Sequence, residues 1–129
     1  MVPVAGFGTR LLPATRSQPK DMLALAGKPL VQYVAEELLA NGGEQILCVT
    51  SRNRTSIENQ FNSDPDLVRQ LSADQKQDLL DEISLDNLGT KFFCNRQPVQ
   101  RGSADAIQCG KNVAGEQLFV VVLGDSMWV

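Results

Sequence analysis

The sequence has 129 residues, of which 43% are hydrophobic and 21% are charged, and it carries a formal net charge of −3. This length and composition suit one globular domain with its own core and exclude an intrinsically disordered chain. The acidic balance argues against a nucleic-acid partner, which would need a basic face, and no apolar run approaches the ~20 residues of a membrane helix.

Histidine is absent, and the three cysteines, Cys48, Cys94 and Cys109, lie far apart in the sequence. The lack of histidine excludes Ser-His-Asp and Cys-His nucleophilic catalysis and every histidine-ligated metal site. Without a CxxC pair, zinc and redox motifs have no support, and the cysteines fit small buried residues in a reducing cytoplasm. Residues 1–6 lack the features of a signal peptide. Any chemistry must therefore use carboxylates, Lys, Arg, backbone amides or a bound hard cation.

The first part of the chain alternates apolar and amphipathic stretches. Residues 2–5 predict a short strand, and residues 6–27 predict a loop with at most one helical turn, because they are rich in Gly, Pro and Thr. Residues 28–41 predict a helix, with Pro29 in its first turn and apolar side chains recurring at helical spacing. A β-branched apolar run predicts a buried strand over residues 45–50.

The second part of the chain has clearer helix-start signals. Ser72 and Gln75 have the spacing of a capping box, and Ser103 is a plausible N-cap. The uninterrupted run Leu-Phe-Val-Val-Val-Leu before Gly124 predicts a strand buried on both faces. In chain order, the patterns predict helices over residues 55–61, 64–71 and 72–83, a strand over 90–95, a helix over 103–111 and a strand over 118–123.

This order of elements predicts an α/β fold with a mainly parallel sheet. Ligands of such sheets bind outside the carboxyl ends of the strands. Three segments are therefore expected at one rim of the sheet: the loop after Val4, the loop after Asn95, and the pair Gly124-Asp125.

The loop after the first predicted strand has features of a phosphate-binding loop. Gly6 and Gly8 let the backbone approach an anion closely, and successive N–H groups in such a turn can surround phosphate oxygens. Arg10 adds a permanent cation with a planar fork, and Lys20 adds a second cation. The Gly-Lys-Ser/Thr end of a Walker A loop is missing, and Leu11 stands where a dinucleotide fingerprint has its third glycine. By itself, this pattern is also compatible with a simple tight turn.

A longer motif carries a resemblance to a known family. The residues PVAGFGTRLLPAT at positions 3–15, PKDML at 19–23 and KPLVQYVAEE at 28–37 resemble the signature of the sugar-phosphate nucleotidyltransferases, in the branch of the bacterial UTP–glucose-1-phosphate uridylyltransferases. The resemblance implies a Rossmann-like, three-layer α/β/α nucleotidyltransferase fold. It also implies that the loop binds nucleotide: the backbone around Ala5 and Gly6 contacts the base, and Gly8 and Thr9 complete the loop. The positions of Arg10 and Lys20 are implied to bind the phosphates and to assist catalysis.

A second segment resembles the base-reading motif of the same family. Arg96-Gln97 is followed by a glycine, Gly102, five residues after Gln97, as in uridylyltransferases that read uracil. An amide side chain offers a donor and an acceptor that match an imide edge, and glycine lets the base stack on bare backbone. Residues 102–106, Gly-Ser-Ala-Asp-Ala, depart from the Gly-Leu-Gly-His-Ala of many uridylyltransferases and look more like superfamily members that use other nucleotides. Gln97 as an ordinary polar surface residue, and Asp105 as a helix-start charge, remain the simpler interpretations.

Asp125 follows the last predicted strand at the position where the family coordinates its catalytic magnesium. Mg²⁺ prefers oxygen ligands, commonly one or two carboxylates together with substrate phosphates. The resemblance therefore implies Mg²⁺ as cofactor and Asp125 as its ligand, whereas a lone Asp after a strand otherwise often forms a turn.

The implied reaction is nucleotidyl transfer from UTP to glucose 1-phosphate, which gives UDP-glucose and pyrophosphate. The resemblance covers nearly all of this chain but only about the first half of a family member. We therefore expect residues 1–129 to form one partial nucleotide-binding domain, incomplete at its C-terminal side, with weak or no turnover. The alternatives are a non-catalytic nucleotide-binding or oligomerisation module, or transfer from another nucleotide to another sugar 1-phosphate. We expect a cytoplasmic homo-oligomer, because unpaired sheet edges favour self-association.

Overall fold

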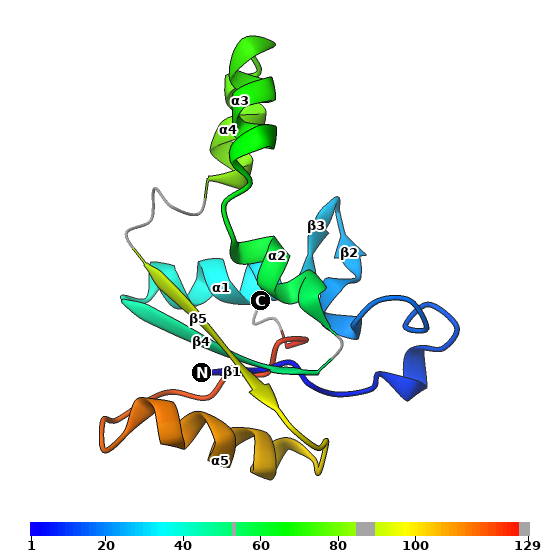
Figure 1. Ribbon diagram of the computed structural model, residues 1–129, viewed down its shortest axis with the longest axis vertical. Coiled ribbons are helices and arrows are strands. Elements are labelled where there is room, and N and C mark those ends of the chain that lie inside the picture. Colours follow the sequence, from blue (N-terminus) through cyan, green and yellow to red (C-terminus); the bar gives the residue numbers. More distant parts are fainter. Residues whose placement is uncertain (53, 85–89, 127–129) are drawn as a thin grey trace.

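A computed structural model describes residues 1–52, 54–84 and 90–126 and shows an α/β fold with three layers (Figure 1). The central sheet has strands β1 (Val2–Pro3), β4 (Gln45–Ser51) and β5 (Lys91–Gln97) in the order β1-β4-β5, and both strand pairs are parallel. The expected α/β class and parallel sheet are confirmed.

Helices cover both faces of the sheet. Helices α1 (Leu30–Ala40) and α2 (Thr55–Phe61) lie on one face, and α5 (Ser103–Ala114) lies on the other (Figure 1). Because a parallel strand must be reached by a crossover, helices naturally come to lie on the faces of such a sheet.

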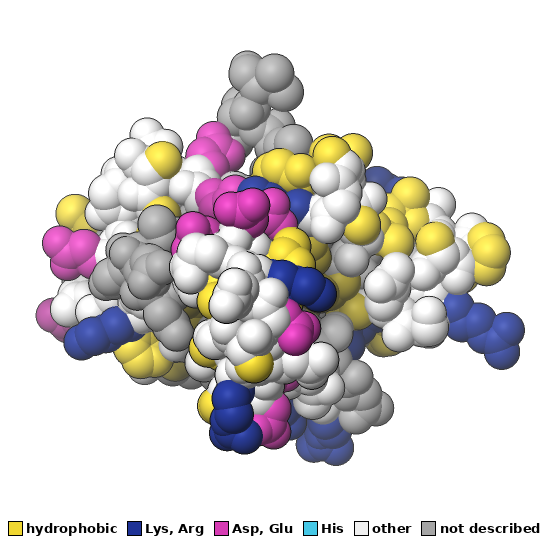
Figure 2. All heavy atoms as spheres, turned by 90° about the horizontal axis from the view of Figure 1, so that it is seen from above, with side chains coloured by type: hydrophobic (Ala, Val, Ile, Leu, Met, Phe, Trp, Pro, Cys, Tyr) yellow, Lys and Arg dark blue, Asp and Glu magenta, His cyan; other side chains and the backbone are white. Residues whose placement is uncertain are grey.

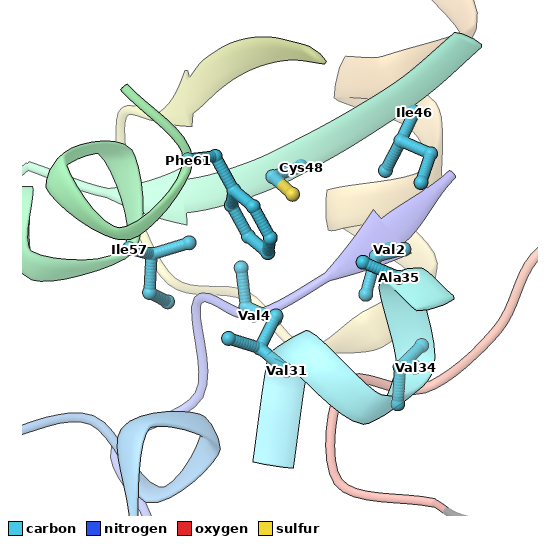
Figure 3. Packing of buried hydrophobic residues seen from close by; sticks show 9 residues of the cluster. All are labelled: Val2, Val4, Val31, Val34, Ala35, Ile46, Cys48, Ile57 and Phe61. Atoms are coloured by element: carbon cyan, nitrogen blue, oxygen red, sulfur yellow. The ribbon is translucent and has the colours of Figure 1, made fainter. Parts of the chain in front are cut away.

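The larger part of the core lies between the sheet and helices α1 and α2 (Figure 3). Phe61 of α2 stacks on Phe92 of β5, with ring centroids 4.5 Å apart. The buried members of this cluster are Val2, Val4, Val31, Val34, Ala35, Ile46, Cys48, Ile57 and Phe61. A smaller cluster joins the opposite sheet face to α5 through Met1, Leu47, Val49 and Ala106. The strands are thereby held from both sides, which fixes the rim that follows them.

Residues 118–123 differ from the expected buried strand. They lie beside β1: the Met1 amino group donates to the Val120 carbonyl (2.7 Å), and the Val122 amide donates to the Met1 carbonyl (3.0 Å). However, this segment has no regular strand assignment, and Leu118 is 104% exposed and Val120 67% exposed. The prediction of burial on both faces was wrong, because burial depends on neighbouring elements, and β1 is the single described strand beside this segment.

The position of residues 118–123 still defines a change of direction in the sheet. Val2 and Val4 pair with β4, whereas Met1 bonds to residues 120 and 122. Successive residues of a strand direct their N–H and C=O groups to opposite edges, so β4 and residues 118–123 lie on opposite sides of β1. Such a switch point is where doubly wound sheets bind ligands.

The loop after β1 contains more structure than expected. It forms 3-10 turns at Thr9–Leu11 and Lys20–Met22, and strand β2 (Ala24–Leu25) pairs antiparallel with β3 (Lys28–Pro29). The two residues between these strands, Ala26 and Gly27, both have positive φ (51° and 85°), as in a type I′ hairpin turn. Helix α1 consequently begins at Leu30 rather than at residue 28.

Helices α3 (Pro65–Ala73) and α4 (Gln77–Ile83) project away from the sheet (Figure 1). The expected capping box at Ser72 was wrong: Ser72 lies inside α3, and its hydroxyl donates to the Val68 carbonyl (2.8 Å). Gln75, at φ 55°, separates the two helices. The observed cap of α3 is Asp64, whose carboxylate accepts from two backbone amides.

The predictions for β4, α2, β5 and α5 are confirmed to within a few residues. The N-cap of α5 is Gly102 rather than the expected Ser103, and it makes no side-chain cap. Figure 2 shows the molecule from the side of α3 and α4, where acidic, basic and apolar side chains lie interspersed over the coloured surface. In the part of the chain that the structure describes, no helix is long and apolar enough to cross a bilayer.

Candidate nucleotide-binding site

The glycine loop lies at the carboxyl end of β1. Gly8 has φ 65°, a conformation that glycine adopts readily, and a β-carbon there would lie 3.0 Å from the Thr15 methyl group. The Thr15 hydroxyl donates to the Gly8 carbonyl (2.7 Å). Thr15 is buried, so this bond anchors the loop to the interior of the protein, whereas Gly6 stays exposed to solvent.

Lys20 and Asp125 meet at this rim, as their predicted positions require. The Lys20 ammonium donates to the Asp125 carboxylate with Nζ 2.6 Å from Oδ2. Both side chains are about one-third exposed, so the pair is open to a ligand. A cation and a carboxylate are thus placed together beside the glycine loop.

Asp21, the neighbour of Lys20 in the chain, was not singled out from the sequence. Its side chain is completely buried, and neither carboxylate oxygen has a hydrogen-bond partner among the described residues. Burial raises the pKa of Asp21 to about 6, although the nearby Lys20 charge by itself lowers it. A β-carbon on Gly124 would collide with Val4 and approach Asp21 Oδ1 to 2.9 Å. Glycine at 124 therefore lets the backbone before Asp125 pass directly over Asp21.

The predicted base-reading residues also lie together. Gln97 ends β5 and is 2% exposed, and its Nε2 donates to the Gly102 carbonyl (3.4 Å) and to Asp105 Oδ2 (2.5 Å). Gly102 has φ 101°, which favours glycine, and directly precedes α5. The amide donor of Gln97, expected to read the base, is thus engaged within the protein, which leaves its carbonyl oxygen as the free group.

Two further side chains tie the base-reading segment and the glycine loop to their neighbours. Gln100 Nε2 donates to the Ala5 carbonyl (2.6 Å), and Arg54 Nη2 donates to the Phe7 carbonyl (3.4 Å). No sequence pattern indicated either residue, because each acts through a contact with a segment far away in the chain.

These segments surround an open cavity of about 650 Å³. Phe7 and residues 15–19 line it from the loop after β1. Residues 51–52 and 54–56 line it from the end of β4 to the start of α2, and residues 97–100 from the end of β5 and the loop after it. The space is large enough for a small ligand. Arg10 is not part of its wall: it lies exposed in the turn Thr9–Leu11 and makes no ion pair with the described residues. Of the predicted site residues, only Gln97 lines this cavity. The Lys20–Asp125 pair and the glycines of the loop lie outside its lining.

A family model described as "Nucleotidyl transferase" matches residues 1–129. The chain belongs to the nucleotidyl transferase family. It is 42% identical to the UTP–glucose-1-phosphate uridylyltransferase of Haemophilus ducreyi over 126 residues, which are 97% of this chain and 43% of that protein. The chain therefore spans less than half the length of this relative.

Solved structures in this nucleotidyl transferase family have the same arrangement. The structure described as UTP-bound UGPase from Acinetobacter baumannii matches with a TM-score of 0.88 and 40% identity, covering 96% of this chain and 44% of that one. A UDP-glucose pyrophosphorylase complexed with UDP-glucose matches with a TM-score of 0.78 and 36% identity, again over 96% and 44%. The predicted family and fold are confirmed.

The fit of the implied magnesium ion to this nucleotidyl transferase chain depends on the carboxylates at the rim. Asp125 is accessible, whereas Asp21 is sealed beneath Gly124. Within the described ranges, no cluster of three or more metal-ligating side chains occurs. One accessible carboxylate suits an ion held mainly by substrate phosphates and water, which is a common mode for Mg²⁺. The residues therefore fit the ion together with a nucleotide.

Proposed function

We propose that this chain binds UTP and forms the nucleotide-binding part of an enzyme that transfers a uridylyl group from UTP to glucose 1-phosphate. The products are UDP-glucose and pyrophosphate. The observation that carries this proposal is the Lys20–Asp125 pair beside the glycine loop, at the switch point of the sheet. The two similar solved structures, one described as UTP-bound and the other as complexed with UDP-glucose, support the choice of nucleotide and sugar.

Each part of the site has a role in this proposal. The exposed backbone around Ala5, Gly6, Gly8 and Thr9 would bind the nucleotide, and Gln97 with Gly102 would contact the base. Lys20 would hold the phosphates, and the exposed side chain of Arg10 would join it on binding, since a guanidinium pairs well with phosphate. The sugar phosphate oxygen would then attack the α-phosphorus in line, with no covalent enzyme intermediate.

Asp125 would hold Mg²⁺ together with the phosphates of the nucleotide. The bound ion would supply neutralisation of the negative charge that develops on the transferring group. Before that, the Asp125 carboxylate must leave Lys20, which frees the ammonium group for a phosphate oxygen. The ion pair thus keeps both groups at the rim until the ligand replaces the contact.

We propose weak or no turnover for this chain alone. It spans under half the length of its relatives, so groups that bind the sugar are expected from the part that these residues do not match. We also propose that residues 1–129 act as one partial domain, in the cytoplasm.

Pyrophosphate release tests the proposed reaction. If the chain releases pyrophosphate measurably, the release should be greatest with UTP, glucose 1-phosphate and Mg²⁺. Replacing UTP by ATP, CTP, GTP or dTTP should give less pyrophosphate. Calorimetric titration with UTP and Mg²⁺ tests binding separately. If the folded chain shows neither release nor binding of UTP, the proposal is wrong.

A second candidate is a non-catalytic nucleotide-binding or oligomerisation module. The exposed apolar segment 118–123 favours it, because an unpaired sheet edge can join another chain. UTP binding without pyrophosphate release from any nucleotide would support this module. A preference for another nucleotide triphosphate in both assays would instead indicate a different activity of the same family.

A further inference from the structure

The orientation of the Gln97 amide is fixed by two acceptors. One is the Gly102 carbonyl, and the other is the Asp105 carboxylate, whose Oδ2 lies 2.5 Å from the amide nitrogen. Because both partners are acceptors, the group that faces them must be the NH₂ and not the oxygen. With Gln97 98% removed from solvent contact, a reversed amide would place two oxygens against each other at a buried position and lose both bonds.

Asp105 is well placed for this contact. It lies in the first turn of α5, where the helix dipole stabilises a carboxylate, and it is partly shielded from solvent. The adjoining Ala106 is buried in the core on this face of the sheet, which anchors the turn. The amide nitrogen of Ala106 also donates to the Gly102 carbonyl (3.2 Å). Gly102 and Asp105 therefore form one rigid acceptor pair around the Gln97 NH₂ group.

The oxygen of the amide is left for a ligand. Gln97 lines the cavity of about 650 Å³. Among the described residues, the hydrogen bonds of its side chain are both made by Nε2, and none is accepted by Oε1. This oxygen is not among the side-chain atoms that are both sealed from solvent and unpartnered. Because Nε2 is held by two acceptors, Oε1 is the amide atom that remains to accept from a ligand.

We propose that Asp105 is a positioning residue for base selection: it holds Gln97 so that the cavity offers an acceptor and rejects a base without a matching N–H. This inference rests on the proposed function, because it assumes that the base of a nucleotide occupies the cavity. Uracil presents an N3–H on its pairing edge, whereas cytosine presents a bare N3 acceptor there, which would face Oε1 unfavourably. The pair therefore favours UTP over CTP.

Spectroscopy tests the contact without any nucleotide. In the free protein, the side-chain NH₂ signals of Gln97, assigned by their loss in Gln97→Glu, should be shifted and slow to exchange. Asp105→Ala should move them to ordinary positions and speed their exchange. Asp81→Asn is a matched control, since Asp81 Oδ1 accepts from Gln77 Nε2 (2.8 Å) on α4, away from the cavity. Unchanged Gln97 signals in Asp105→Ala would overturn the inference.

Calorimetry tests the selection itself. In Asp105→Ala, which removes the carboxylate acceptor, the ratio of UTP to CTP affinity should fall about 10-fold, corresponding to one net hydrogen bond. Asp81→Asn should keep the wild-type ratio. Equal losses for both nucleotides would show a merely structural role and overturn the inference while leaving the proposed function intact. If the wild type binds no nucleotide, the proposed function and the selection both fail, and the spectra still decide whether Asp105 holds Gln97.

Discussion

Lys20 and Asp125 are 105 positions apart in the sequence, yet their side chains form the shortest ion pair in the described structure, at 2.6 Å. Each residue follows an element that flanks the switch point: Lys20 belongs to the loop after β1, and Asp125 follows the segment beside β1. The pair is thus a consequence of the topology. Because it is partly exposed, it should contribute little to folding stability and yet be accessible to a ligand.

Asp125→Asn should leave the fold almost as stable as before, because partly exposed ion pairs contribute at most about 1 kcal/mol. In contrast, Mg²⁺ should no longer strengthen UTP binding, with a loss of roughly 10-fold or more if Asp125 holds the ion with the phosphates. Calorimetry with and without Mg²⁺ measures this effect. Asp66→Asn, at an exposed pair on α3, is the control. The same Mg²⁺ dependence in Asp125→Asn and wild type would contradict the role of Asp125.

Asp21→Asn should stabilise the protein at neutral pH. Burial raises the pKa of Asp21 from 3.8 to about 6, so the folded state favours the protonated form. Folding stability should therefore fall as pH rises from about 4 to about 6, and the penalty should persist above that range. A shift of this size corresponds to about 2–3 kcal/mol, and neither oxygen has a described partner to lose.

Urea unfolding at several pH values checks this prediction. The gain in the free energy of unfolding for Asp21→Asn should be greatest above pH 6 and should vanish below pH 4. Asp66→Asn again serves as the control, because Asp66 is exposed. A gain that is independent of pH would mean that ionisation of Asp21 is not its cause.

Much of the fold follows from local patterns in the sequence. The apolar runs in β4 and β5 and the signals around α2 and α5 gave elements of the right type, because these residues have the same preference locally and in the packed fold. The prediction of a helix start at Ser72 failed: its spacing to Gln75 matches a capping box, but α3 continues through Ser72 to Ala73. The hairpin at Ala26 was missed because a positive φ at alanine is not indicated by residue type.

Some features of the candidate site could likewise be predicted from the sequence, and others could not. The positions of Lys20, Gln97 and Asp125 at one rim could be predicted, since the carboxyl ends of parallel strands meet at one edge. The contact of Asp105 with Gln97 and the burial of Asp21 could not, because both depend on distances between separate elements. The exposure of residues 118–123 was missed because an apolar sequence does not specify which neighbour covers it.

Cys94 should react with iodoacetamide before Cys48. The two residues are register partners on β5 and β4, and Cys94 is exposed whereas Cys48 is buried. A hydrogen bond from the Cys48 thiol lowers the pKa of Cys94, with a smaller effect from the Arg96 charge, so thiolate should form below pH 9.0. The pH profile of alkylation, followed by mass spectrometry, measures this. In Cys48→Ala the midpoint for Cys94 should rise, and an unchanged midpoint would exclude the thiol contact as the cause.

The segment 118–123 should make the chain self-associate, and Val120→Lys should reduce that association. Leu118 and Val120 are exposed on an edge that carries no charge, and such an edge can add a strand from a second copy. Lysine at 120 replaces an exposed side chain, so folding should be little affected, while strand addition should be disfavoured by charge. Sedimentation velocity over a range of concentrations measures the effect. Leu67→Lys, at an exposed apolar position on α3, is the matched control and should leave association unchanged. A wild-type chain that stays monomeric throughout, or equal association of both variants, would show that this edge is not the contact.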